Sequence, residues 1–110
     1  MMHSCGSVVK LIPQFIELGL DCLQAGQPKA KGMDPVSISE EFGGKLVFCS
    51  TMDEQENLPN GTLEDVRNEA NRRKQVFTCC VGFILGPSHN IQTDTTIENI
   101  IAMYGEGSKY

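Results

Sequence analysis

Three side chains of this sequence have types and positions that could carry chemistry. His3 and Cys5 form a His-x-Cys pair, and Gly6 directly after it allows the backbone to turn. His89, the only other histidine, stands in the segment Pro87-Ser-His-Asn. Imidazole and thiol groups both bind zinc, but an isolated loop histidine is more often a surface or hydrogen-bonded structural residue. The case for a site therefore depends on the elements that position these side chains.

The residues around His89 predict a buried strand followed by a helix. Residues 81–85 are an apolar run without a polar member, closed by a Gly-Pro pair that punctuates strands. The next helix could be capped by Asp94 or Thr95, and Glu98, three residues after Thr95, would complete a capping box. Its apolar face would consist of Ile97, Ile100 and Ile101. His89 would then lie at the carboxyl end of a strand, where α/β sheets place their chemistry.

The rest of the chain alternates between short apolar strands and amphipathic helices. The first two residues read as the end of a strand that delivers His3, so we expect the chain to begin inside a strand, with sequence missing upstream. Proline is best tolerated in a first helical turn, so the helix that contains Pro13 should begin near Leu11 or Ile12. Later elements are expected at 20–23 (strand), 36–42 (helix capped by Asp34), 45–49 (strand), 58–61 (turn) and 62–76 (helix capped by Thr62).

This order of elements predicts an α/β fold with a parallel sheet, because alternating strands and helices are joined by right-handed crossovers. About four β/α units fit into residues 1–110, with the first strand truncated. Four such units are half of a (β/α)8 TIM barrel, which usually has roughly 250 residues. A half barrel has two open strand edges and an uncovered inner face. We therefore expect poor stability in isolation and association through these edges, as a homodimer or with a missing half.

Composition and charge exclude several functional classes. The 110 residues form at most one domain, and a net charge of −5 does not suit a nucleic-acid surface, which needs clustered lysines and arginines. The basic cluster at residues 72–74 falls late in a predicted helix, where cations complement the helix dipole. The sequence has no apolar run long enough to span a membrane, no signal start and no glycine-rich nucleotide motif. We therefore predict a cytoplasmic protein without a membrane or nucleic-acid partner.

Short segments along the whole chain carry a resemblance to a known family. They are His3-Ser-Cys-Gly-Ser7, Leu11-Ile-Pro13 with Ile16-Glu17, Asp21-Cys-Leu-Gln24, Gly32-Met-Asp34, Pro87-Ser-His-Asn-Ile-Gln92, and Glu98-Asn-Ile100 with Ala102-Met103. In this order they resemble the C-terminal part of the uroporphyrinogen decarboxylase family. The resemblance implies a single (β/α)8 barrel. Residues 1–110 would be its second half, from the end of the fifth strand through the eighth helix.

The first function that the resemblance implies is decarboxylation of a porphyrinogen in tetrapyrrole (heme) biosynthesis, without a metal or another cofactor. The acidic residue and the arginines that perform this reaction in the family would lie upstream of Met1. No catalytic residue is therefore assigned on this chain, and the chain alone is expected to be inactive. What the resemblance does assign here is substrate binding by His89, in the loop after the last strand.

Further substrate-binding candidates lie in two other loops. Asp53 follows the seventh strand of the expected barrel and could be a carboxylate in the cleft, although aspartate is also common as a turn residue. In the same loop the family pattern has glycines where Ser50 and Thr51 stand, which is a departure of this sequence. Gln24 and Gln27 lie after the sixth strand, and each could hydrogen-bond a polar substrate or serve as a loop amide.

The second function that the resemblance implies is that of the corrinoid-dependent methyltransferases, which share the fold and bind a zinc ion that activates a thiol. Their ligands are a His-x-Cys pair after the fifth strand and a cysteine after the eighth. His3 and Cys5 match the pair, and His89 aligns with the third ligand. Zinc accepts imidazole and thiolate alike, and catalytic zinc sites keep a fourth position open. The partners would then be a thiol and a methyl-corrinoid.

Three hypotheses thus follow from the sequence. The first, at the level of the family, is a fragment of a porphyrinogen decarboxylase. The second is a zinc-dependent corrinoid:thiol methyltransferase, and the third is a truncated product without catalytic activity.

Overall fold

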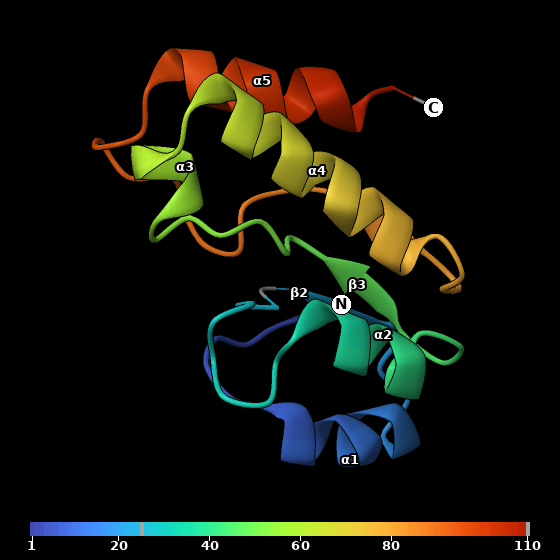
Figure 1. Cartoon of the computed structure of the whole chain (residues 1–110). Helices are drawn as coiled ribbons and strands as arrows, with labels where there is room; N and C mark the ends of the chain where they lie inside the picture. The colour runs from blue at the N-terminus through green and yellow to red at the C-terminus, as the bar shows by residue number, and fades with distance from the viewer. Residues whose placement is uncertain (25, 110) are drawn as a thin grey trace.

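Four short strands form one parallel sheet at the centre of the fold (Figure 1). The computed structural model describes residues 1–24 and 26–109. The strands β1 (Met2–His3), β2 (Cys22–Gln24), β3 (Val47–Cys49) and β4 (Phe83–Ile84) lie side by side in chain order. Each adjacent pair is parallel. The α/β class and the parallel sheet that the alternating pattern predicts are therefore confirmed.

Helices connect the strands. In chain order they are the short 3-10 helix η1 (Val9–Leu11), α1 (Ile12–Glu17), α2 (Pro35–Phe42), α3 (Asn57–Asn60), α4 (Leu63–Phe77) and α5 (Ile97–Gly107). Right-handed crossovers between parallel strands in this unbroken order place the connecting helices on the same face of the sheet. Among the described residues, no helix combines the length and the apolar character that a membrane span requires.

The two faces of the sheet differ because side chains alternate along each strand. Leu23 and Phe48 are partners in register, point to the helix-covered face, and are fully buried. His3 and Gln24 are also partners in register, and they belong to the opposite set. Ile84 lies in that second set too, and 53% of its surface is exposed. The second face is therefore open at β4, and it is the face from which His3 projects.

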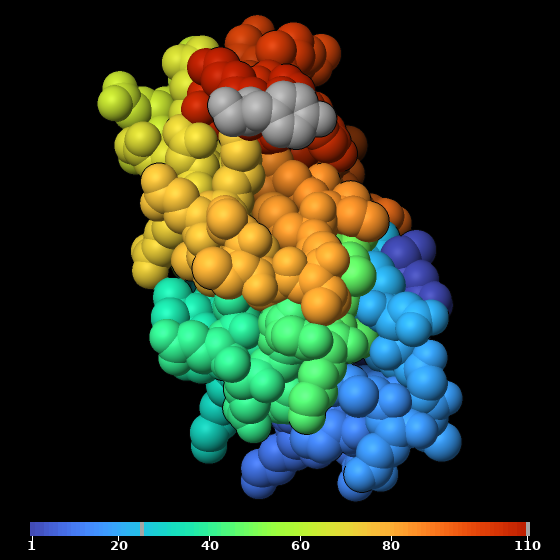
Figure 2. Space-filling view, turned by 90° about the vertical axis from the view of Figure 1, so that its right-hand side faces the viewer, coloured from blue at the N-terminus to red at the C-terminus, as the bar shows by residue number. Residues whose placement is uncertain are grey.

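Two apolar clusters hold the helices to the sheet. The first joins β2 and β3 to α1, α2 and the end of α4, and its aromatic centre is a row in which Phe77 lies 5.4 Å from Phe48 and 4.8 Å from Phe83, ring centre to ring centre. The second cluster lies under α3, α4 and α5 and consists of Met52, Leu58, Val66, Ala70, Ala102 and Met103. In Figure 2 the blue residues around α1 lie at the bottom of the molecule, and α4 and α5 (yellow to red) lie in its upper part.

Helix starts follow the local sequence closely. Helix α1 begins at Ile12 with Pro13 in its first turn, as the proline predicts. The Asp34 side chain accepts a hydrogen bond from the Ser37 N–H at 3.1 Å and caps α2. Thr62 and Asp65 form a reciprocal capping box at the start of α4, which is the acidic first turn expected there. These three predictions are confirmed.

The predicted start of α5 is wrong by one or two residues. The cap is Thr96, whose hydroxyl accepts from the Asn99 N–H at 3.3 Å, and not Asp94 or Thr95. The physical reason is the position of Asn99, which has to face inward. Its side-chain amide donates to the Leu58 carbonyl at 2.8 Å and to the Gly61 carbonyl at 3.0 Å.

The predicted apolar face of α5 is also wrong. With Asn99 inward, residues three and four positions later share its side, and these are the buried Ala102 and Met103. Ile97 and Ile101 then lie on the opposite side and are 70% and 65% exposed. A polar tertiary contact has thus overridden the hydrophobicity of the helix.

Two smaller expectations also need correction. Residues 57–60 form the short helix α3 rather than only a turn, because Leu58 is fully buried and anchors them in the second apolar cluster. The strands are shorter than the apolar runs that predict them: β4 spans Phe83–Ile84 within the run 81–85, since Val81 is already 61% exposed.

Candidate functional site

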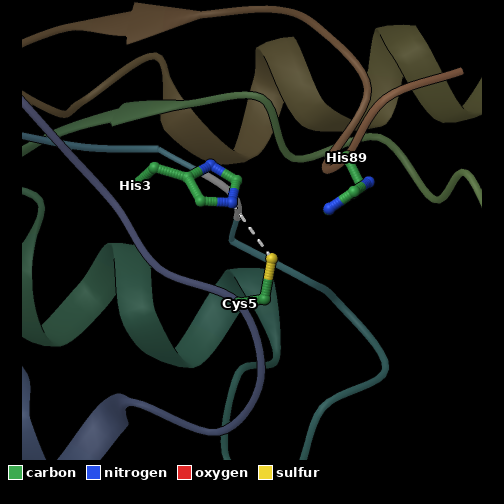
Figure 3. A group of neighbouring side chains, drawn as sticks. All are labelled: His3, Cys5 and His89. Carbon is green, nitrogen blue, oxygen red and sulfur yellow. Dashed lines mark hydrogen bonds between the residues drawn. The ribbon is translucent and has the colours of Figure 1, made fainter.

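His3, Cys5 and His89 converge at one place (Figure 3). The Sγ atom of Cys5 lies 3.2 Å from Nε2 of His3. The two imidazole rings meet edge to face, with their centres 5.9 Å apart. One possible ligand atom from each of the three residues can be chosen so that all lie within 4.8 Å of one another. All three side chains are exposed, so the cluster is open to solvent.

The cluster joins the two outer edges of the sheet. His3 ends β1 and His89 follows β4, and these are the outermost strands. Three strand spacings of about 4.8 Å would place the outer strands of a flat sheet roughly 14 Å apart. The two rings are instead 5.9 Å apart. The segment 85–89 after β4 therefore brings His89 back toward the end of β1.

Hydrogen bonds from neighbouring loops fix the two loops that carry the cluster. The Ser4 N–H donates to the Gln24 carbonyl at 3.3 Å, and the Gly6 N–H donates to Oε1 of Gln27 at 2.7 Å. Gly6 has a φ of 80°, which explains why a glycine follows Cys5. The Gln27 side chain is thus used to position the Cys5 loop.

The His89 loop rests on the loop that follows β3. The Ser88 N–H donates to the Met52 carbonyl at 2.8 Å, and Met52 pairs with Pro87 in an isolated parallel bridge. The Ser88 hydroxyl, which is buried, donates to the Glu54 carboxylate. The position of His89 therefore depends on residues 52–54.

A pocket of about 440 Å³ opens beside the cluster. It is lined by His3, Gln24, Ser50, Leu85, Gly86, Pro87, Ser88, His89, Asn90, Ile91 and Tyr104. The structure therefore brings Gln24 together with His3 and His89, as expected if these residues share a site. Its volume lies within the range of about 300–1,000 Å³ that is usual for small-molecule sites.

The structure does not bring Asp53 to this pocket. Asp53 is 5% exposed, and its carboxylate pairs with Lys29 at 3.3 Å and accepts the Gln55 N–H at 3.0 Å. It lines a separate pocket of about 670 Å³ near α2, α3 and α4. These contacts match the turn-residue alternative for Asp53, and its proposed role in substrate binding stays a prediction.

A buried ion pair explains why the loop of Asp53 turns toward α4. The Asp53 N–H donates to Glu69 at 3.1 Å, and Glu69 in turn accepts from Nη2 of Arg73 at 2.9 Å. Arg73 also donates from Nε to the Thr51 carbonyl at 3.1 Å. Burial raises the pKa of the Glu69 carboxyl, while the Asp53 hydrogen bond and the charge of Arg73 oppose that rise. Arg73 is therefore a buried structural cation that fixes residues 51–53.

Ser50 is a pocket residue that sequence reasoning did not single out for function. Its φ is 62°, the left-handed region that favours glycine, and it is the one non-glycine residue with a positive φ among those described. The loop thus keeps the conformation that a glycine pattern implies, although a serine occupies it. The one sequence feature that could have singled out Ser50 was that it stands where the family pattern has a glycine. A second missed residue is Tyr104, which reaches the pocket from α5.

The donor set fits a zinc ion. Two imidazoles and a thiolate are ligand types that zinc uses in proteins, and tetrahedral bonds of the usual lengths put ligand atoms about 3.5 Å apart. The 3.2 Å separation of Cys5 Sγ and His3 Nε2 is close to that value. Three protein ligands would leave one coordination position for a substrate, and the adjoining pocket provides room for it.

Comparisons with protein-family models, with curated proteins and with solved structures find no match for this chain. What the site can do therefore follows from its own side chains.

Proposed function

We propose that this chain is the zinc-binding part of a corrinoid:thiol methyltransferase related to the uroporphyrinogen decarboxylase family. The observation that carries the proposal is the meeting of His3, Cys5 and His89 at the carboxyl ends of the two outermost strands. A set of zinc ligands beside a small-molecule pocket suits activation of a thiol. Decarboxylation without a metal does not require two histidines and a cysteine to lie together.

In such a site, different residues of the chain would bind the metal, position the two loops and contact the substrate. His3, Cys5 and His89 would hold the zinc ion, which lowers the pKa of a substrate thiol when bound. Gln27 fixes the loop of Cys5 through the Gly6 N–H, and Ser88 fixes the loop of His89. The pocket positions the substrate, with Gln24 on the side of β2. The methyl-corrinoid partner has to reach the cluster from the solvent side, where all three ligands are exposed.

The same proposal includes the architecture. A sheet of four parallel strands in chain order, with side chains from beyond its two outer strands meeting in one cluster, supports the second half of a (β/α)8 barrel. The open second face, where Ile84 is exposed, would be the barrel interior. Self-association through the free edges of β1 and β4 follows from this proposal and is measurable by light scattering on a sizing column.

Metal analysis tests the proposal. The protein is dialysed against zinc, then exhaustively against metal-free buffer, and its zinc content is measured. We expect one zinc ion per chain for the unchanged protein and a loss in Cys5→Ala and His89→Ala, whereas the matched control Cys79→Ala, an exposed cysteine away from the cluster, keeps it. Methylation of a thiol by methylcobalamin is the activity to assay. Zinc-free wild-type protein would end the proposal.

The decarboxylase remains a second candidate because Gln24 and His89 line one pocket, as two substrate-binding residues should. In that case His89 hydrogen-bonds a porphyrinogen, no metal is needed, and a chelator leaves the activity unchanged. The catalytic acid and the arginines have no assigned position within residues 1–110. A chain that neither binds zinc nor decarboxylates a porphyrinogen would favour the third hypothesis, a product without catalytic activity.

A further inference from the structure

The pocket beside the cluster is polar but carries no ionic side chain. No lysine, arginine, aspartate or glutamate lines it within the part of the chain that the structure describes. Glu54, which does not line the pocket, is engaged by the Ser88 hydroxyl, and Lys29 is paired with Asp53 in the other pocket. An anionic group at the end of the ligand remote from the metal position would therefore find no lysine or arginine to replace the hydration that it loses, which is unfavourable.

Hydrogen-bonding groups line the pocket instead. Gln24 ends β2, Ser50 and Asn90 lie in the loops after β3 and β4, and Tyr104 belongs to α5. Their side chains offer both donors and acceptors. Such a lining suits hydroxyl or amide groups, because its hydrogen bonds replace those that an uncharged ligand makes to water.

Ser50 stands out among these groups because its backbone is strained. A serine in the left-handed region is less stable than glycine would be, and such outliers collect at functional sites. Ser50 is 8% exposed, and its hydroxyl has a 3.2 Å contact with the neighbouring Cys49 sulfur and no other hydrogen bond within the described residues. The hydroxyl stands against Gly86, where an added Cβ would come within 3.1 Å of Oγ. The glycine thus keeps space open at this wall of the pocket.

We propose that the pocket selects an uncharged, hydroxyl-bearing thiol, and that Ser50 is a specificity-determining residue that hydrogen-bonds the hydroxyl of this ligand. The inference rests on the proposed function, since the thiol sulfur binds at the open metal position while its proton goes to solvent. The remainder of the thiol lies in the pocket between Ser50 and Tyr104. Thiols that carry a carboxylate or a sulfonate are disfavoured.

Ligand binding to the cobalt-loaded protein tests this inference. Cobalt(II) replaces zinc, and the thiolate-to-cobalt absorbance band is titrated under anaerobic conditions with thioglycerol, propanethiol and mercaptopropionate. After correction for the ionisation of each free thiol, we expect thioglycerol to bind about tenfold or more tightly than mercaptopropionate. Mercaptopropionate binding as tightly as thioglycerol would overturn the inference.

Two variants test the role of Ser50. In Ser50→Ala and Ser50→Gly, thioglycerol should bind about 3- to 10-fold more weakly, as for the loss of one neutral hydrogen bond, while propanethiol binding is unchanged. Ser50→Gly removes the hydroxyl without adding backbone strain, so it keeps the fold intact. An equal change for both thiols would show a structural role only and would contradict the assignment. Absence of cobalt binding in the wild-type protein would refute the proposed function itself, whereas cobalt binding with a preference for the anionic thiol refutes only this inference.

Discussion

Removal of Arg73 should destabilise the protein more than any surface substitution. The Arg73 and Glu69 side chains are 9% and 11% exposed, and they are joined at 2.9 Å. In Arg73→Met the Glu69 carboxylate loses its ionic partner and the Thr51 carbonyl loses its donor. Breaking a buried pair by removing one partner costs about 3–5 kcal/mol, which is a large part of the stability of a small domain.

The size of this effect should depend on pH in a defined direction. Burial raises the pKa of Glu69 above its ordinary value of 4.5, and Arg73 opposes that rise, so the pKa in folded Arg73→Met lies higher still. The folded variant then binds the proton more tightly than its unfolded chain. The contribution of the Glu69 proton to the stability of the variant is therefore fully present below pH 4.5, and it is lost as the pH rises through the folded-state pKa. The difference from wild type should shrink as the pH falls from neutral toward 4.5.

Urea unfolding at neutral pH and at pH 4.5, followed by circular dichroism, measures these free energies of unfolding. The matched control is Arg72→Met, an exposed arginine of the same helix, which should change stability by less than about 0.5 kcal/mol. The double variant Arg73→Met/Glu69→Gln should recover at least half of the loss, because no buried charge remains unpaired. Equal unfolding midpoints for Arg73→Met and Arg72→Met, or a loss independent of pH, would refute the buried-pair reasoning.

Further predictions concern backbone strain, helix capping and the metal ligands. Ser50→Gly should stabilise the protein by about 0.5–1 kcal/mol, because relief of a left-handed Cβ outweighs the entropy of glycine; a lowered melting temperature would contradict this. Thr96→Val should cost about 1 kcal/mol through loss of the α5 cap. Thr95→Val should cost nothing, since its buried hydroxyl has no hydrogen-bond partner among residues 1–24 and 26–109; equal melting temperatures for the two variants would place the cap elsewhere. Addition of EDTA to the zinc-loaded protein should lower the melting temperature of wild type but not of Cys5→Ala.

The sequence predicts those features of the fold that depend on local interactions. The Asp34 cap, the Thr62–Asp65 box and the position of Pro13 involve residues within one helical turn, so their positions follow from residue types alone. The buried face of α5 could not be predicted in this way. It depends on Asn99 reaching carbonyls of the α3 region, and no periodicity of α5 encodes that partner.

The candidate site shows the same division. The meeting of His3 and His89 follows from parallel strands whose carboxyl ends face one edge, and the segment after β4 completes it. The same argument places Asp53 in the cleft, but the Glu69–Arg73 pair draws its loop toward α4. Hydropathy assigns an arginine to the surface, and the only local hint of burial was a glutamate four positions earlier.

The cluster also links metal affinity to the folding of the whole chain. Because His3 ends β1 and His89 lies in the segment after β4, their side chains meet only after β2 and β3 have assembled between the two outermost strands. The site does not form in a partly assembled sheet, so an ion that binds there stabilises only the complete sheet. At a free concentration 1,000 times its dissociation constant, such an ion would add about 4 kcal/mol to the free energy of unfolding. Metal supply would then set how much folded protein a cell contains, as well as how active that protein is.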